Sequence, residues 1–243
     1  MAPHLRPSAD KAIHQFSFVD ALVVGLYDGA FPTSAVLERG DLGVGCGDSL
    51  DGELVIIDGL AYLCRGDGEV SLVPADELVP FAEVARFEPT FSRTVTGLSE
   101  HAFESLVESL VPSDNLFYAI RVDGAFDRMT VREATRQQRP FPGLAEAVQS
   151  QHENTVESTS GTMVGFKGPD VFQGLSVADF HLHYLDEARG FGGHVMDFQL
   201  RDARLTIEAY STFTLHLPEV ESYLDAELDD IDADADIRSA ESS

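Results

Sequence analysis

The chain has 243 residues, 44% of them apolar, which is enough for one large or two small globular domains. Its 16 Lys and Arg residues against 42 Asp and Glu residues give a net charge of −26. Nucleic acids and anionic membranes are bound through Lys and Arg contacts to phosphate, so this charge argues against both as partners. The first residues hold no apolar segment of the secretory kind, and no stretch is apolar over the length of a membrane span, so we expect a cytoplasmic protein.

The acidic residues are spread along the chain, and Lys11 and Lys167 are its only lysines. Two explanations fit this composition. One is an acidic patch for a basic partner, and the other is a surface adapted to high salt, where repulsion between charges is screened within about 3 Å at 1 M. The even spread of the acid favours the second explanation, so we expect a halophilic protein.

The N-terminal part mixes short helices with strands. Residues 1–13 are expected to be a loose leader, Ser17 to cap a helix within residues 16–27, and Pro32 to begin a shorter helix that Gly40 ends. The glycine-dense stretch 40–52 lacks the lysine and the following helix of a phosphate loop.

A meander of strands follows. We expect strands at 53–59, 60–65 and 70–73, separated by the Asp-Gly turns at 58–59 and 67–68. Glu53 stands at the start of the first strand, where a solvated strand end is the ordinary interpretation. The two cysteines, Cys46 and Cys64, form no metal-binding motif. We expect two reduced thiols, and a disulfide is the weaker alternative.

The middle of the chain continues the alternation of strands and helices. We expect a strand at 81–87 and a helix at 98–110 that Ser99 caps. A strand at 117–122 is expected to end at Asp123-Gly124, and a helix at 142–151 follows.

Four arginines gather in this otherwise acidic chain. They are Arg128, Arg132, Arg136 and Arg139. Local charge balance is one explanation. The other is an anion site, because a guanidinium group binds a carboxylate through two parallel hydrogen bonds.

The chemistry of the C-terminal half centres on three histidines. Residues 180–185 alternate histidine with apolar side chains, which places His181 and His183 on one face of a strand. A turn follows, and a second strand begins at His194. If the two strands form a hairpin with His183 opposite His194, three imidazoles converge, because directly opposed Cβ atoms lie about 4.5–5.5 Å apart. Three nitrogen ligands with an open position are typical of catalytic zinc, although manganese, iron, cobalt and nickel also accept imidazole.

The remaining stretches give further strands and a tail. We expect strands at 158–166, 205–210 and 213–217, and we interpret His216 as structural rather than as a fourth ligand. The acidic tail resembles the start of a calcium loop at 232–236, but Ile237 stands where glycine is required, so a calcium site is rejected.

Six stretches, read together and in order, resemble the α-acetolactate decarboxylase family from about Gln15 to the tail. They are ALVVGLYDG at 21–29, ERGDLGVG at 38–45, LDGEL at 50–54, YAIRVDGAF at 118–126, GTMVGFKGP at 161–169, and HLHYL with FGGHVMDF at 181–198. The resemblance implies a zinc enzyme that converts (S)-2-acetolactate to (R)-acetoin and carbon dioxide, with the metal stabilising an enediolate intermediate.

The resemblance also assigns roles to residues. It places the metal ligands on His181, His183 and His194, and the catalytic groups on Glu53, Arg132 and Glu241, with Glu227 as the alternative for the last. Ala178-Asp179 and Glu133-Ala134-Thr135 depart from the family pattern, which puts only local loop shape in question.

The family fold is α/β in the α+β-like sense: two mostly antiparallel or mixed β-sheets with flanking helices, usually in a homodimer. The metal site is expected on a β-hairpin of the C-terminal half. We divide the chain into the leader 1–13, an N-terminal α/β part at 14–150, a β-rich metal-binding part at 151–220, and an acidic tail at 221–243 that is able to close over the site.

Two other functions compete with this one. A cupin-like metalloenzyme, such as a dioxygenase or isomerase, also uses a histidine pair with a distant third histidine, and Asp186 or Glu187 would imitate its usual glutamate. A non-catalytic binding protein that kept the metal is the second alternative.

Overall fold

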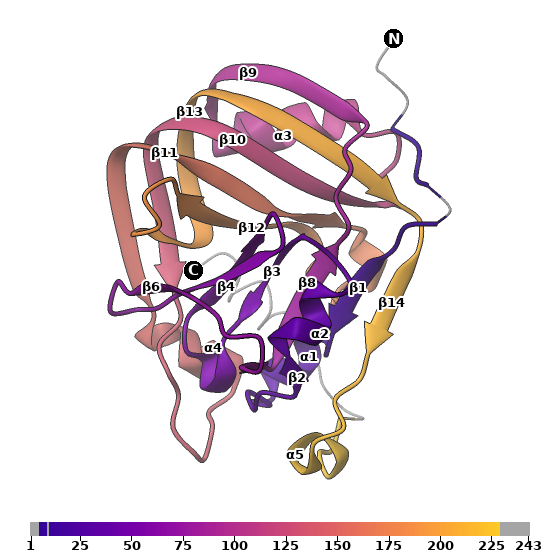
Figure 1. The fold of residues 1–243 in the computed structure, drawn as a ribbon, viewed down its shortest axis with the longest axis vertical. Coiled ribbons are helices and arrows are strands. Elements are labelled where there is room, and N and C mark those ends of the chain that lie inside the picture. Colours follow the sequence, from indigo (N-terminus) through magenta and orange to yellow (C-terminus); the bar gives the residue numbers. More distant parts are fainter. Residues whose placement is uncertain (1–4, 9, 229–243) are drawn as a thin grey trace.

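Two main β-sheets face each other across a shared apolar core (Figure 1). The structure is a computed structural model, and it describes residues 5–8 and 10–228. One sheet has seven strands and the other has five, and a small two-stranded sheet joins β2 (Phe31–Pro32) to β7 (Leu78–Val79). Val44 and Val55 of the first sheet share one cluster with Val164 and Phe166 of the second. The prediction of two mostly antiparallel or mixed sheets is confirmed.

The seven-stranded sheet has the order β14-β1-β8-β3-β4-β5-β6. Its strands are β1 (Ile13–Phe16), β3 (Leu42–Cys46), β4 (Glu53–Ile57), β5 (Leu60–Cys64), β6 (Val70–Leu72), β8 (Phe81–Ala85) and β14 (Phe213–His216). All neighbours pair antiparallel except β1 and β14, which are parallel, so the sheet is mixed. The predicted meander is β4-β5-β6.

Strand β3 was not predicted, because its glycines look like a loop. A Cβ atom at Gly43 would lie 2.4 Å from the carbonyl oxygen of Glu83, and one at Gly45 would lie 2.4 Å from that of Phe81. The glycines therefore permit a close approach of β3 to β8 rather than a turn.

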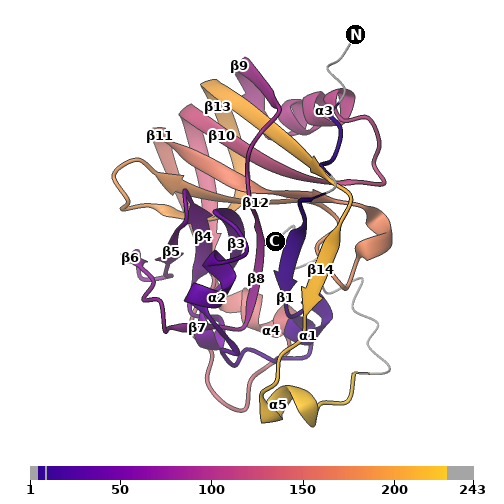
Figure 2. The ribbon, with the colours of Figure 1, turned by 45° about the vertical axis from the view of Figure 1, so that its right-hand side comes forward.

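The five-stranded sheet has the order β10-β11-β12-β13-β9, and β10 also pairs with β13. Its strands are β9 (Phe91–Ser99), β10 (Phe117–Glu133), β11 (His152–Gly168), β12 (Asp179–Asp186) and β13 (Gly192–Tyr210). The four strands from β10 to β13 thus pair in a closed circuit. Figure 2 shows β9, β10, β11 and β13 curving together above the first sheet.

The prediction that a strand ends at Asp123-Gly124 is wrong. β10 runs straight through this dipeptide, and Gly124 lies between Gly161 of β11 and Ala203 of β13. A Cβ atom at Gly124 would lie 2.4 Å from the Cβ of Ala203. Glycine is needed here because the neighbouring strand comes too close for a side chain. An Asp-Gly pair in the sequence does not distinguish this case from a turn.

Short helices flank the sheets. They are α1 (Val19–Val23), α2 (Thr33–Leu37), α3 (Glu100–Leu110), α4 (Leu144–Ala147), α5 (Glu221–Leu224) and the 3-10 turns η1 (Asp48–Leu50), η2 (Val148–Ser150) and η3 (Asp170–Phe172). The predicted cap of α3 is confirmed, because the Ser99 side chain accepts a hydrogen bond from the Ala102 amide. Within the described ranges, none of these helices has the length and apolar character that crossing a bilayer requires.

The predicted cap at Ser17 is wrong. Ser17 has a φ of 63°, and its amide donates to the carbonyl oxygen of His216 on β14. The strand pair β1–β14 therefore extends to this residue, and α1 begins only at Val19 without a side-chain cap.

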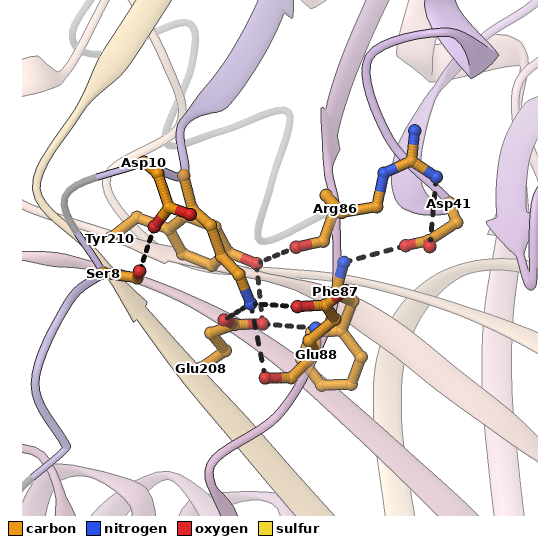
Figure 3. Close-up of polar contacts among 9 residues, drawn as sticks. Ser8, Asp10, Asp41, Arg86, Phe87, Glu88, Glu208 and Tyr210 are labelled. Atoms are coloured by element: carbon orange, nitrogen blue, oxygen red, sulfur yellow. Dashed lines mark hydrogen bonds and ion pairs between the residues drawn. The ribbon is translucent and has the colours of Figure 1, made fainter.

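A polar cluster joins the residues before β1 to the second sheet (Figure 3). Lys11 forms ion pairs with Glu208 of β13 and, at 3.1 Å, with Glu88. Glu208 is 3% exposed and also accepts the Glu88 amide at 2.6 Å and the Tyr210 hydroxyl at 3.1 Å. The cluster thus links the segment before β1 and the residues after β8 to β13. The division of the chain at residues 13, 150 and 220 stays a prediction.

Candidate active site

The three histidines meet as the hairpin geometry predicted. In the pairing of β12 with β13, His183 lies directly opposite His194. The ring centroids of His181 and His183 are 5.0 Å apart, and each lies 5.3 Å from the ring of His194. One nitrogen of each ring lies within 4.8 Å of the others, and all three residues are buried. A β-hairpin of the C-terminal half therefore carries a compact imidazole cluster.

Asp186 holds the turn of this hairpin. Its carboxylate accepts the amides of Gly190 at 2.7 Å and Phe191 at 3.0 Å. These bonds close the connection between β12 and β13 and set their register. The Asp186 carboxylate therefore stabilises the turn and does not face the histidine cluster. It is not the fourth metal ligand that a cupin-like site would need.

The orientation of His183 is set by the first sheet. Its Nδ1 lies 2.8 Å from the carbonyl oxygen of Leu54. A carbonyl only accepts, so Nδ1 carries the hydrogen and Nε2 keeps its lone pair. Nε2 of His183 and Nδ1 of His181 are both buried without a hydrogen-bond partner. Buried polar atoms of this kind are rare, and a metal ion would satisfy both.

Burial also keeps the imidazoles of His181 and His183 neutral. Desolvation, followed by the positive charge of Arg132, lowers the pKa of His181 to about 3. Desolvation and then the neighbouring His181 lower the pKa of His183 well below its ordinary value. Metal binding requires neutral imidazole, so the charge state, the donor set and the unpartnered nitrogens fit a divalent transition metal.

Glu53 reaches this cluster from the opposite sheet. It begins β4, and its Oε2 lies 3.6 Å from Nε2 of His183.

The two cysteines lie on either side of Glu53: its neighbours across the sheet are Cys46 of β3 and Cys64 of β5. Both cysteines are free and buried. Because β4 lies between them, two strand spacings separate the cysteines, roughly 10 Å, which is beyond the reach of a disulfide.

Arg132 approaches from β10. It pairs directly with His194 across β10 and β13, so both side chains point to the same face. It is 5% exposed, and its Nη1 donates to Oε1 of Gln151 at 3.1 Å.

The other three arginines of the cluster form ion pairs with aspartates. Arg128 pairs with Asp197, Arg136 with Asp48 and Asp51, and Arg139 with Asp28. Local charge balance therefore accounts for these three arginines, and the anion site stays a prediction for Arg132. Only Arg132 of the four lines the cavity beside the histidines.

A cavity lined by residues of both sheets lies at this point. Glu53, Arg132, Gln151, His181 and His194 give it a polar side. The rest of the wall is largely apolar and includes Val19, Leu22, Leu50, Phe81, Ala134, Leu144, Val148 and Val177. An apolar cavity with a few converging polar groups is the usual form of a small-molecule site.

The structure does not test the first choice for the second glutamate. Glu241 lies outside the described residues. The alternative, Glu227, is exposed beyond α5 and does not line the cavity.

His216 lies on β14, away from the histidine triad. Its ring is stacked on that of Phe16, with centroids 4.5 Å apart, and its Nε2 lies 3.1 Å from Nδ1 of His14. Its interpretation as structural agrees with this position.

Two contributors were missed from the sequence. The Leu54 carbonyl is a backbone group that carries no sequence signal. Gln151 is a single glutamine at the end of a predicted helix, and only the pairing of β10 with β11 brings it to Arg132.

Comparisons with known proteins agree with this site. The sequence model of the family described as alpha-acetolactate decarboxylase matches residues 13–230. The alpha-acetolactate decarboxylase of Methylococcus capsulatus is 39% identical over 220 residues, which cover 90% of this chain and 85% of the relative. That of Bacillus subtilis is 37% identical over 232 residues, covering 95% and 91%. The crystal structure of the enzyme from Bacillus subtilis strain 168 superposes with a TM-score of 0.93, at 37% identity, covering 96% of this chain and all of that one. The chain therefore belongs to the α-acetolactate decarboxylase family.

Proposed function

We propose that this protein is a carboxy-lyase that converts (S)-2-acetolactate to (R)-acetoin and carbon dioxide. The observation that supports it most is the meeting of a buried histidine triad with Glu53 and Arg132 at one cavity, in a chain of this family. Each group suits one demand of the reaction. The substrate is a small anion, it loses carbon dioxide, and it must then gain a proton on carbon.

His181, His183 and His194 would hold the metal, which we propose to be Zn²⁺. Bound there, the ion would supply Lewis-acid stabilisation to negative charge that develops on oxygen as carbon dioxide leaves. The ring nitrogens of His181 and His183 that lack a partner are the donors for it. Other divalent transition metals also accept three imidazoles.

Arg132 would bind the substrate carboxylate. Its guanidinium is buried in the wall of the cavity, where a charge-assisted pair is screened little by water. The planar fork would fix the orientation of the carbon–carbon bond that breaks. As carbon dioxide leaves uncharged, the same group would remain beside the electron-rich product of cleavage.

Glu53 would handle the proton. Its carboxyl lies 3.6 Å from His183 at the cavity, within reach of a substrate bound beside the triad. Delivery of a proton to one face of the planar carbon would give a single acetoin enantiomer. Glu241 is the second proposed proton-handling residue, on the strength of the family resemblance alone.

The oligomeric state and the cellular location of the enzyme are inferred from its family and its charge. We propose a homodimer in the cytoplasm of a salt-adapted cell, with a small-molecule substrate and neither nucleic acid nor membrane as partner. The net charge of −26 supports the absence of nucleic acid and of membrane as partners, because it opposes binding to phosphate-rich surfaces.

The test is to mix the purified protein with racemic acetolactate in molar salt and to measure acetoin by chiral chromatography. Formation of (R)-acetoin at the expense of one substrate enantiomer is expected. Oxygen consumption without acetoin would support a cupin-like dioxygenase instead. Saturable binding of an acetolactate analogue without turnover would support a binding protein.

A further inference from the structure

We infer that Gln151 is a positioning residue for the reaction: its side-chain amide fixes the direction in which Arg132 presents its guanidinium to the substrate carboxylate. This inference rests on the proposed function. It adds a residue that touches Arg132 and lines the same cavity.

The backbone at Gln151 is held from both sides. It directly follows η2 as its C-cap, and its amide donates to the carbonyl oxygen of Val148 at 3.2 Å. The next residue, His152, begins β11, where it pairs with Glu133 of β10. Gln151 thus enters the cavity from a fixed point immediately beside the strand that carries Arg132.

The hydrogen bond itself constrains the guanidinium. Arg132 Nη1 donates to Gln151 Oε1 at 3.1 Å, and both residues line the cavity. A guanidinium is planar, so fixing one terminal nitrogen limits the rotation of the whole fork. With less rotational freedom to lose, Arg132 would bind a carboxylate through two bonds at a smaller entropic cost.

The chemistry of the acceptor is also specific. An amide oxygen accepts a hydrogen bond without adding negative charge, so this bond orients Arg132 without opposing an anionic substrate. A carboxylate at position 151 would repel the substrate carboxylate at the cavity wall.

The first test replaces Gln151 with methionine, which keeps the length and volume of the side chain but offers no oxygen. We expect kcat/KM for acetolactate to fall about tenfold, the usual effect of losing one charge-assisted hydrogen bond. Gln149→Ala is the matched control, because Gln149 is exposed and its amide bonds only the carbonyl of Ala145 among the described residues. Equal kcat/KM in Gln151→Met and the wild type would overturn the inference.

The second test uses Gln151→Glu, which restores an acceptor of the same shape but adds a negative charge. We expect kcat close to that of the wild type, with a KM raised more than in Gln151→Met. A purely structural role predicts no such split between KM and kcat. A Gln151→Glu enzyme with an unchanged KM would therefore contradict the inference.

The third test is a double-mutant cycle with Arg132→Lys, which lacks the fork. If Gln151 acts through Arg132, Gln151→Met lowers kcat/KM by less than about twofold in this background. A full tenfold loss there would show an independent role and would overturn the inference. Absence of acetoin from the wild-type enzyme would instead remove the proposed function itself.

Discussion

The Nδ1 of His183 on β12 donates a 2.8 Å hydrogen bond to the carbonyl oxygen of Leu54 on β4. This bond joins the two sheets at the site. Leu54 directly follows Glu53, so the strand that supplies the carboxylate also orients the imidazole. A shift of one sheet relative to the other would therefore disturb the histidine triad and its distance to Glu53 together.

Replacing His183 by alanine is expected to remove the metal. The triad would lose its most buried ligand, and two imidazoles rarely hold zinc in a catalytic site. We expect metal content to fall from about one ion per chain to less than about a tenth, with acetoin formation reduced more than about 100-fold. Elemental analysis and an activity assay measure this. His216→Ala is the control and should keep the metal, and retention of metal by His183→Ala would remove it from the ligand set.

Replacing Glu53 by glutamine is expected to reduce kcat while leaving the metal in place. The amide keeps the shape of the side chain but neither gains nor releases the proton, a change worth about 10²–10⁴ in rate for a general acid or base. Steady-state kinetics with metal analysis of the same sample checks this. Glu69→Gln, on the exposed turn between β5 and β6, should match the wild type. A normal kcat in Glu53→Gln would assign proton handling to another group.

Glu83 is expected to make stability fall as pH rises. It is 1% exposed on β8, and desolvation raises its pKa from 4.5 to about 8, while a hydrogen bond from Ser176 at 3.3 Å opposes the shift. Between these two values the folded state holds a proton that the unfolded state has lost. The contribution of Glu83 therefore weakens with rising pH through this window, by at most about 1.4 kcal/mol per pH unit, and levels off above about pH 8.

Urea unfolding of the wild type and Glu83→Gln at about pH 5 and about pH 8 measures this effect. The glutamine does not titrate, so its stability relative to the wild type should increase from the lower to the higher pH. A difference that is the same at both values would show that Glu83 has an ordinary pKa in the folded protein.

Salt is expected to stabilise the protein. Repulsion within a chain of charge −26 is screened over about 8 Å at physiological ionic strength but over about 3 Å at 1 M. We expect Tm to rise between dilute buffer and molar potassium chloride, by about 2–4 °C for each kcal/mol of repulsion removed. Thermal melts across a salt series test this, and full stability and activity in dilute buffer would contradict the high-salt interpretation.

The sequence by itself determined the features that depend on neighbouring residues. The alternation at His181 and His183 gave the face of the strand, and the turn before His194 suggested the hairpin register that the structure has, because the two strands are adjacent along the chain. The cap at Ser99 and the meander β4-β5-β6 were predictable for the same reason. The motif resemblance then added Glu53 and singled out Arg132 among the four clustered arginines.

Only the tertiary structure decided how distant segments meet. Gly43 and Gly124 look like turn residues, yet each stands in a strand where another chain segment comes too close for a side chain. Arg132 shares a face of the sheet with His194 through the pairing of β10 with β13, whereas Arg128, Arg136 and Arg139 pair with surface aspartates. Spacing along a chain fixes periodicity and register within a hairpin. Which polar groups share a buried space depends on the pairing of strands far apart in sequence, and that pairing is set by the packing of the whole core.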